Sequence, residues 1–481
     1  GDDNVVYGDD NYVYGIWNTV DGDDNTLNDA WYNQVNGNRN YVELDYNTIN
    51  GNRNSVVGSE NIVNGNRNDI EGDLNRAIGN DNIIDGNRNR AVGDNNDIDG
   101  NRNRLTGDDN TIVGNRNGLL NAALGGIVGS GNTITGDDNE ITGDDNDVTG
   151  DDNTIAGDSN DVTGWDNSVT GDDNTLFNSF WGDAWQNTVV GNGNSIDGDY
   201  NNVTGDGNTV FDSSDYAVYN TVAGDDNTID GDNNNVTGDD NEVTGDNNTL
   251  FNSGSGLAQQ NIVVGNGNSI DGEYNDVTGD NNTLFNSTDF FAWYNTVQGD
   301  DNTIDGDYND VTGDGNNLFG DDNTVVGNLN GIAGDLNDVT GDSNGILGDE
   351  NTVVGNQNWV FGNENTIDAG DQNLIVGDLN GVNGNQNWVL GDANSIDAGD
   401  QNWIVGDQNG VNGNQNWVFG NANTIDAGDL NLVTGNGNFV DGSENALLGD
   451  VNYVAGNQNW VVGDANTIDA GDLNLVTGNG N

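Results

Sequence analysis

The sequence predicts an all-β fold, a parallel β-solenoid (β-roll) in which two seven-residue units of the form G-x-x-N-x-[V/I/L]-x close each 14-residue coil. First, this unit repeats along nearly the whole chain of 481 residues, and short repeats of fixed length are typical of solenoids. Second, distinctive residues recur every 14 positions. Third, the chain has 75 Gly and no Pro, yet almost every unit keeps an aliphatic residue, which indicates an ordered chain.

Each unit predicts one short strand and one tight turn, as residues 136–164 illustrate (GDDNEIT GDDNDVT GDDNTIA GDSNDVT G). Side chains alternate along a strand, so the Asn and the aliphatic residue point inward and their neighbours point outward. Gly and the polar residues after it suit a turn that needs positive φ. We expect the inward Asn side chains to bond the turn backbone and, stacked at about 4.8 Å, to bond one another.

The spacing of arginine indicates that two units make one coil. The phrase GNRN begins at two sets of positions with a 14-residue spacing, Gly37, Gly51 and Gly65, then Gly86, Gly100 and Gly114. The same spacing separates Arg76, Arg90 and Arg104. We therefore expect Arg39, Arg53 and Arg67 to be neighbours in successive coils. The alternative is a triangular 21-residue coil of three units, which would scatter these positions over different faces.

A second period marks the C-terminal region. Three tryptophans, Trp359, Trp388 and Trp417, recur with a 29-residue period, which is two coils plus one residue. The extra residue is the Ala of the phrase IDAG, at Ala369, Ala398 and Ala427. Each of these insertions is expected to enlarge one coil without changing the winding.

The chain divides into four regions by composition. Residues 1–118 hold the Arg-bearing coils, and residues 119–130 (LLNAALGGIVGS) predict an irregular coil. Residues 131–320 are highly acidic and contain a 74-residue super-repeat with aromatic loop excursions. Residues 321–481 form a Trp-rich solenoid with the 29-residue period. Because Met is absent even at position 1, we expect a processed product or a segment of a longer protein.

The charge excludes several classes of function. The chain has 82 acidic residues against nine Arg, a net charge of −73, which repels nucleic acid and anionic membranes and attracts cations. No apolar run approaches the roughly 20 residues of a membrane span. Without His, Cys or Lys, few residues are available for acid–base or nucleophilic chemistry, so we expect no enzyme. The Arg residues are expected to pair internally with Asp and Glu.

Stacked turn carboxylates predict a cation site. On a 14-residue coil, Asp138 and Asp152 are neighbours about 5 Å apart, and two unit charges at that distance repel by about 3 kcal/mol at an effective dielectric constant of 20. Oxygen ligands without His or Cys suit a hard cation, and Ca²⁺ is the predicted ion. The alternative is that these residues only form solvated turns. The candidate ligands are Asp137, Asp138, Asp144, Asp145, Asp151 and Asp152.

Exposed aromatic residues predict an interaction surface. They occur in the loop excursions of the acidic region and at outward positions of the Trp-rich region, beyond what a soluble monomer normally exposes. The favoured interpretation is lateral packing between copies, and the alternatives are stacking on sugar rings or local cover for each coil. The candidates are Trp181, Trp185, Phe290, Phe291, Trp293, Trp359, Trp388, Trp403, Trp417 and Trp460.

The repeat resembles two known families. Its 14-residue coil of two G-x-x-N-x-[V/I/L]-x halves is similar to the YadA-like heads of trimeric autotransporter adhesins, in spacing more than in residue identity. Units such as GDDNTI also resemble the calcium-binding RTX repeat, although the nine-residue length and the second Gly of that repeat are missing. Both resemblances imply a secreted surface fibre or adhesin.

Together these features predict an extracellular or cell-surface structural protein, part of a filament, sheath or fibre that is stabilised by cations and joined by aromatic contacts. The first alternative is a calcium-dependent adhesin that binds a glycan or a host partner. The minor alternative is an ice-binding protein, since flat solenoids with Thr arrays bind ice. Outward pairs here are mixed, as in T-I-D and D-V-T, and seldom place two Thr around one aliphatic residue.

Overall fold

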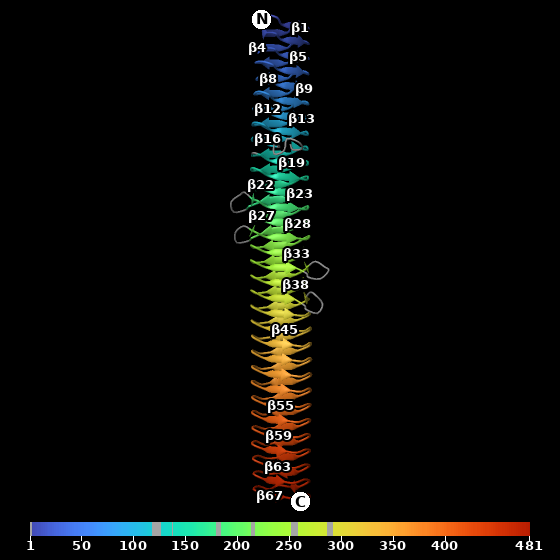
Figure 1. Cartoon of the computed structure of the whole chain (residues 1–481), viewed down its shortest axis with the longest axis vertical. Helices are drawn as coiled ribbons and strands as arrows, with labels where there is room; N and C mark the ends of the chain where they lie inside the picture. Colours follow the sequence, from blue (N-terminus) through green and yellow to red (C-terminus); the bar gives the residue numbers. More distant parts are fainter. Residues whose placement is uncertain are drawn as a thin grey trace. The chain divides into compact units, whose positions relative to one another are not determined.

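Each repeat unit forms a three-residue strand and a four-residue turn, and two units close one coil (Figure 1). The computed structural model describes residues 2–117, 127–136, 138–178, 184–212, 217–251, 258–285 and 292–481. By its internal contacts the chain forms two compact units, Gly1–Asn241 and Glu242–Asn481. No helix long and apolar enough to cross a membrane occurs in the described part of the chain.

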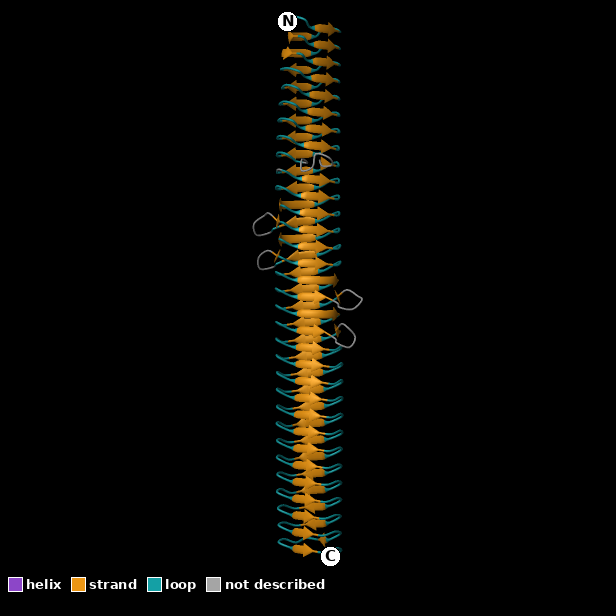
Figure 2. Cartoon of the chain, in the orientation of Figure 1, coloured by secondary structure: helices purple, strands orange, loops and turns teal. Residues whose placement is uncertain are grey.

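Strands alternate between two parallel sheets, sheet A and sheet B, which form the two faces of a ribbon in each unit. Successive strands in one sheet are offset by one 14-residue coil: β8 (Ser55–Val57) pairs with β10 (Asp69–Glu71), with Ser55 opposite Asp69. Strands of the two sheets point in opposite directions (Figure 2). The predicted parallel β-solenoid with two heptads per coil is therefore confirmed, and the triangular coil is wrong.

The arginine series lies in register as predicted. The Arg53 backbone N–H donates to the Asn38 carbonyl oxygen at 2.9 Å, and the Arg67 N–H donates to the Asn52 oxygen at 2.9 Å. Arg39, Arg53 and Arg67 therefore occupy equivalent turn positions in successive coils, all with φ near +62°. The left-handed conformation at the third turn position recurs along both units.

The core consists of one aliphatic column and one Asn column behind each sheet. The aliphatic side chains, such as Val56 and Ile70, are fully buried, and so are the Asn side chains. Asn54 Nδ2 donates to Asn40 Oδ1 of the preceding coil at 3.1 Å and to the Gly65 carbonyl oxygen at 2.9 Å. The predicted Asn ladder thus bonds both the turn backbone and its own neighbours.

The extra Ala of the 29-residue period lies in a β-bulge. The register shifts between Ile367 and Ala369 where β52 (Thr366–Ala369) pairs with β54 (Gly381–Asn383), and the same shift recurs at Ala398 and Ala427. A bulge accommodates one additional residue while the flanking pairs keep their register. The expected insertion without a change of winding is therefore what the structure shows.

Candidate functional site

Six strands of sheet A in the first unit present a flat face that we call the threonine face. Its strands are β21 (Thr154–Ala156), β23 (Ser168–Thr170), β26 (Thr188–Val190), β28 (Asn202–Thr204), β31 (Thr221–Ala223) and β33 (Asn235–Asp239). The first and third residue of each strand point outward, and the central aliphatic residue is buried. Of the twelve outward side chains six are Thr, and none is charged or aromatic. They are Thr154, Ala156, Ser168, Thr170, Thr188, Val190, Asn202, Thr204, Thr221, Ala223, Asn235 and Thr237.

The six threonines form a checkerboard. Thr188 lies opposite Asn202 on the next strand, and Val190 lies opposite Thr204. The next pair inverts the pattern, with Asn202 opposite Thr221 and Thr204 opposite Ala223. Neighbouring strands are about 4.8 Å apart and outward residues within a strand are about 7 Å apart, so the hydroxyl and methyl groups occupy a regular two-dimensional array.

Buried hydrogen bonds hold this array rigid. Beneath the threonine face, the Asn201 backbone N–H donates to Asn187 Oδ1 at 2.9 Å, and Asn201 Nδ2 donates to the Ala217 carbonyl oxygen at 2.9 Å. Thr is β-branched, which limits its χ1 rotamers and suits an exposed strand position. The face is therefore ordered before any ligand binds.

Sheet B of the same coils differs in charge. Its strands β20 (Asp147–Thr149) and β22 (Asp161–Trp165) place Asp147 opposite Asp161 at outward positions. Burial, with Asp147 beside it, raises the pKa of the Asp161 carboxyl above its ordinary value. Carboxylates therefore interrupt the pattern of Thr on this face, and only one face of these coils is uncharged.

A second flat face, which we call the tryptophan face, lies on sheet A of the second unit. It consists of the outward residues of β51 (Trp359–Phe361), β53 (Leu374–Val376), β55 (Trp388–Leu390), β57 (Trp403–Val405) and β59 (Trp417–Phe419). The ring centroids of Trp388 and Trp403 are 5.6 Å apart, and those of Trp403 and Trp417 are 5.5 Å apart, with the rings tilted by 59° and 55°. The predicted stripe of exposed aromatic residues is thus one continuous apolar surface.

The other aromatic candidates lie elsewhere. Trp460 is exposed on β65 (Trp460–Val462) of the same sheet, further along the chain. Trp185 stacks on Trp165 with 5.6 Å between ring centroids, and Trp293 is partly exposed on β41 (Ala292–Trp293) of the second unit. Trp181, Phe290 and Phe291 lie outside the described residues, as do most of the predicted loop excursions.

The candidate calcium ligands fall at two opposite edges of the ribbon. The turn with Asp144 and Asp145 precedes a strand of sheet B, whereas the turns with Asp138, Asp151 and Asp152 precede strands of sheet A. Asp138 forms an ion pair with Arg116, and Asp144 Oδ1 accepts a hydrogen bond from the Ser130 N–H at 2.7 Å. Asp137 lies outside the described residues. Calcium binding stays a prediction.

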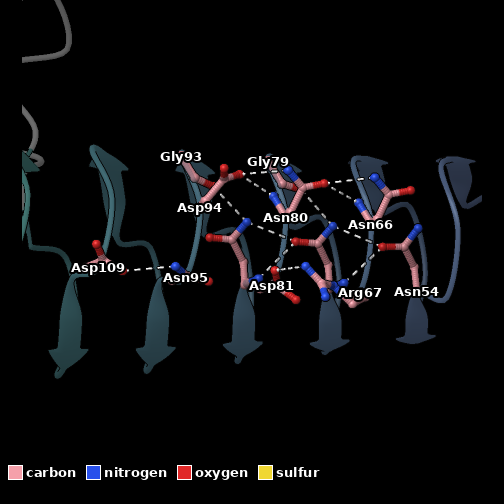
Figure 3. A network of polar contacts seen from close by, with 12 residues as sticks. Asn54, Asn66, Arg67, Gly79, Asn80, Asp81, Gly93, Asp94, Asn95 and Asp109 are labelled. Carbon is pink, nitrogen blue, oxygen red and sulfur yellow. Dashed lines mark hydrogen bonds and ion pairs between the residues drawn. The ribbon is translucent and has the colours of Figure 1, made fainter.

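Turn side chains form ladders of their own, shown for one edge in Figure 3. The Asn66 backbone N–H donates to Asn80 Oδ1 at 2.9 Å, and the Asn80 N–H donates to Asp94 Oδ1. In the same turns Arg67 pairs with Asp81. In these turns the Asn or Asp after Gly therefore accepts a hydrogen bond from the preceding coil, which gives this position a structural role that does not require a metal.

The expectation that the arginines pair internally holds for only part of the set. Ion pairs join Arg39 to Asp24, Arg67 to Asp81 and Arg116 to Asp138. Within the described ranges Arg53, Arg76, Arg88, Arg90 and Arg102 have no ion pair. The physical reason is the neighbour in the adjacent coil. Each paired Arg lies next to an Asp at the same turn position, whereas Arg53 lies between two other arginines of its turn column and Arg90 lies between Arg76 and Arg104 in sheet A.

Comparison with known sequence families identifies a family whose pattern matches the chain. The family described as the grass antifreeze beta roll matches residues 1–100, 84–178, 286–377 and 377–478, which is well over half of the chain. The chain belongs to this antifreeze beta roll family. The matched ranges include β21 and β23 of the threonine face and all of the tryptophan face. A search among curated proteins found no match. The resemblances to YadA-like heads and RTX repeats are not shown by these comparisons.

Three carboxyl groups, one in a turn and two in strands, predict a pH dependence for this beta roll. Burial, and then the carboxylates of Asp138 and Asp166, raise the pKa of Asp152, and burial raises the pKa of Asp161 and Asp199. At these three carboxyls the folded state binds protons more tightly than the unfolded state. Their contribution to stability is greatest below the ordinary Asp pKa of about 4 and is lost as the pH rises through that value and the raised folded values. We expect a higher melting temperature near pH 4 than at pH 7 in circular dichroism.

The variant Asp152→Asn tests whether the Asp152 carboxylate destabilises the folded state at neutral pH. It should raise the melting temperature at pH 7 and reduce the pH dependence, because it removes one carboxylate from a column of three. The matched control is Asp322→Asn, at the same turn position between Tyr308 and Leu336, which should change little. A melting temperature of the wild-type chain that is lower near pH 4 than at pH 7 would contradict the prediction.

Proposed function

We propose that this chain binds ice through the threonine face. The observation that carries the proposal is the rigid array of twelve outward residues on the six sheet A strands of the threonine face. Half of these residues are Thr, and none carries a charge or an aromatic ring. Membership of the antifreeze beta roll family supports it.

The physical argument concerns how water lies on such a face. Each Thr offers a hydroxyl that bonds water and a methyl group that does not, so water over the array is ordered by both. The array repeats at the spacing of the β-sheet, about 4.8 Å between strands, which is close to the spacing of oxygen atoms on planes of ice. A pre-ordered surface loses little conformational entropy when it binds. Adsorbed protein then pins the ice front and slows its growth.

Charge explains why this face is favoured over the Asp-bearing sheet B. A carboxylate holds its own hydration shell strongly and disfavours transfer to a crystal lattice that excludes ions. In the second unit, β46 (Thr324–Val326) and β48 (Asp338–Thr340) of sheet B repeat the geometry of β26 and β28, with Asp338 in the place of Asn202. This pair of strands provides a matched control.

The experiment compares two double variants. Thr188→Tyr with Thr204→Tyr places two bulky side chains at the centre of the threonine face, and Tyr is tolerated at exposed strand positions. This variant should lose most of the thermal hysteresis and of the inhibition of ice recrystallisation. Thr324→Tyr with Thr340→Tyr should retain both activities. The single variant Asn202→Asp, which gives the threonine face the charge of its counterpart, should weaken both.

Two outcomes would overturn the proposal. One is a wild-type chain that causes neither thermal hysteresis nor inhibition of recrystallisation at micromolar concentration. The other is equal loss of activity in the two double variants, since the effect would then not belong to the threonine face. Circular dichroism of each variant separates loss of binding from loss of fold.

The structural filament and the calcium-dependent adhesin expected from the sequence have no support in these comparisons, which favour the ice-binding alternative. An extracellular location, a glycan partner and the absence of enzymatic activity and of nucleic-acid binding likewise stay predictions.

Lateral self-association through the tryptophan face is a second candidate, because Trp359, Trp388 and Trp417 are about half exposed within a face that carries no charge. Converting these three residues to Ser should abolish association that persists at high salt, measured by sedimentation velocity. The control converts Trp17, Trp31 and Trp165, which are similarly exposed elsewhere, to Ser. Association that survives the first triple variant would contradict the prediction.

A further inference from the structure

Sheet A of the second unit is uncharged on its outer face over eight successive strands. Three strands, β45 (Asn317–Phe319), β47 (Gly331–Ala333) and β49 (Gly345–Leu347), precede the five strands of the tryptophan face in register. None of the outward residues of these eight strands is charged, whereas sheet B of the same coils carries Asp310 and Asp338 at outward positions. In a chain of net charge −73, this face lets two copies meet without bringing acidic side chains together.

A hollow lies at the start of this uncharged face. Asn317, Gly331 and Gly345 are the first outward residues of β45, β47 and β49, and they lie in one column. A Cβ at Gly331 would meet no atom within 4 Å, and the hollow over the two glycines is walled by Phe319 and Trp359. The missing side chains therefore leave an apolar depression three strands long.

A ridge follows in the same column. Trp359, Leu374, Trp388, Trp403 and Trp417 continue the column from β51 to β59, and each Trp is between 36% and 54% exposed. Leu374 lies in a second depression, between Trp359 and Trp388. The last three tryptophans thus form a projecting part of the face that is as long as the hollow.

We infer that two copies of this chain pack through these eight strands as an antiparallel pair, with a two-fold axis along the strand direction between β51 and β53. The inference rests on the self-association proposed above for the tryptophan face, and it specifies the register of the two copies. The axis places β51 opposite β53 of the other copy, β49 opposite β55, β47 opposite β57 and β45 opposite β59. Because the axis runs along the strands, each column meets the same column of the other copy.

In this register the tryptophans of one copy face short side chains of the other. Trp403 lies opposite Gly331 of the other copy. Trp388 likewise lies opposite Gly345. Since packed sheets are about 10 Å apart, a Trp ring fits against Gly but not against a second Trp. A parallel pair would set each strand opposite itself, so Trp403 would meet Val405 and the hollow would stay unfilled.

The area of the contact is that of a stable interface. The second outward column adds five side chains that are between 37% and 55% exposed, Phe319, Leu347, Phe361, Val376 and Leu390. Aromatic side chains present up to about 250 Å² each, so the exposed side chains of the eight strands amount to roughly 700 Å² per copy. Covering both copies would remove about 1,400 Å², within the roughly 1,200–2,000 Å² of specific interfaces.

A ladder of glutamine amides borders the tryptophan column and gives the contact a polar rim. Gln372 Nε2 donates to Gln357 Oε1 at 2.9 Å, and Gln386 Nε2 donates to Gln372 Oε1 at 2.9 Å. These two bonds leave one N–H and one lone pair of the Gln372 amide for further partners. Gln357 and Gln372 line the same depression as Trp359, so the two-fold axis brings these amides beside those of the other copy.

The symmetry and charge of the pair predict its behaviour in solution. Each copy contributes the same surface, so the contact closes at two copies. Salt screens the repulsion between the acidic chains and leaves the apolar contact intact. The dimer should therefore be more stable at about 0.5 M salt than at about 0.01 M salt.

The test exchanges ridge and hollow in the full chain. Gly331→Trp should weaken the dimer at least tenfold, roughly, because the new ring meets Trp403 of the other copy, and Trp403→Gly should weaken it by a similar factor through loss of the ridge. The double variant again places one large and one small residue at each contact, so its dissociation constant should lie within about threefold of the wild-type value. Sedimentation velocity over a concentration series measures these constants.

Gly410→Trp is the matched control. Gly410 begins β58 (Gly410–Asn412) of sheet B, and a Cβ there would also meet no atom within 4 Å. The new ring therefore lies on an exposed strand of the same unit but away from the contact, and this variant should dimerise as wild type does.

A spin label reports the orientation of the two copies. The chain has no Cys, so Leu430→Cys, in the turn before β61 (Leu432–Thr434), provides a single attachment point. In the antiparallel pair nine strand spacings, about 43 Å, separate the two labels. A parallel pair would hold them at the same height, separated only by the width of the ribbon.

The outcomes separate this inference from the self-association candidate. A wild-type chain that is monomeric at about 0.5 M salt would overturn both. If wild type dimerises through the tryptophans but the double variant stays monomeric, or if the labels are close together, self-association stands and the antiparallel register is wrong. Retention of a monomeric chain on insoluble cellulose, lost when Trp359, Trp388 and Trp417 become Ser, would assign the face to a neutral polysaccharide and would also overturn the inference.

Discussion

Replacing Asn330 with Ala is expected to lower the free energy of unfolding by roughly 3–5 kcal/mol. The Asn330 side chain is buried and takes part in four hydrogen bonds. Nδ2 donates to Asn316 Oδ1 at 3.0 Å and to the Gly341 carbonyl oxygen at 2.9 Å. Oδ1 accepts from the Asn344 backbone N–H at 3.0 Å and from Asn344 Nδ2 at 3.1 Å. Ala removes all four and leaves buried groups of the neighbouring coils unpaired.

Thermal and denaturant unfolding followed by circular dichroism measures this loss, and hydrogen exchange locates it in the coils next to Asn330. The control is Asp335→Asn, at the exposed turn position, where Oδ1 accepts from the Asp321 N–H at 2.8 Å and Asn retains that acceptor. It should change stability by no more than about 0.5 kcal/mol. Equal effects of the two substitutions would mean that the buried ladder contributes no more to the free energy of unfolding than the turn ladder does.

Replacing Gly327 with Ala is expected to destabilise the second unit by roughly 2–5 kcal/mol. Gly327 has φ +140°, and a Cβ there would lie 2.1 Å from the carbonyl oxygen of Gly341 in the next coil. The neighbouring atom is backbone and takes part in the stack, so the two coils must separate to relieve the overlap.

Gly331→Ala is the matched control four residues away. A Cβ at Gly331 meets no atom within 4 Å, and its φ is outside the left-handed region. Ala should be neutral there or stabilise by about 0.5 kcal/mol, since Gly loses more conformational entropy on folding. Melting temperatures of the two variants in the same buffer decide the matter, and a Gly331→Ala variant as unstable as Gly327→Ala would contradict the steric explanation.

The winding could be read from the sequence because the repeat is local. The 14-residue spacing of Arg39, Arg53 and Arg67 is a property of the chain that only a two-strand coil turns into direct stacking. The same holds for the bulges at Ala369, Ala398 and Ala427, where one inserted residue must leave the pairing.

The threonine face was harder to find, because adjacent units lie on opposite faces. Read along the chain, Asp161 and Thr163 precede Ser168 and Thr170 and appear as one mixed series, but the first pair belongs to sheet B and the second to sheet A. The uncharged face emerges only when alternate units are separated. Internal pairing of the arginines was predicted because acidic residues alternate with them along the chain, but in sheet A Arg90 lies between Arg76 and Arg104 and has no acid as an in-register neighbour.

The two kinds of amide ladder run in opposite senses along each unit. In the buried ladder the later coil donates to the earlier one, as from Asn344 to Asn330, whereas in the turn ladder the earlier coil donates to the later one, as from Asp314 to Asn328. Their dipoles therefore oppose each other, and lengthening a unit does not accumulate the end-to-end polarity that aligned peptide groups give a helix. Duplication or deletion of whole 14- or 29-residue blocks therefore leaves the net dipole of the ladders along the unit unchanged. This dipole does not limit how far molecules of this design diverge in length.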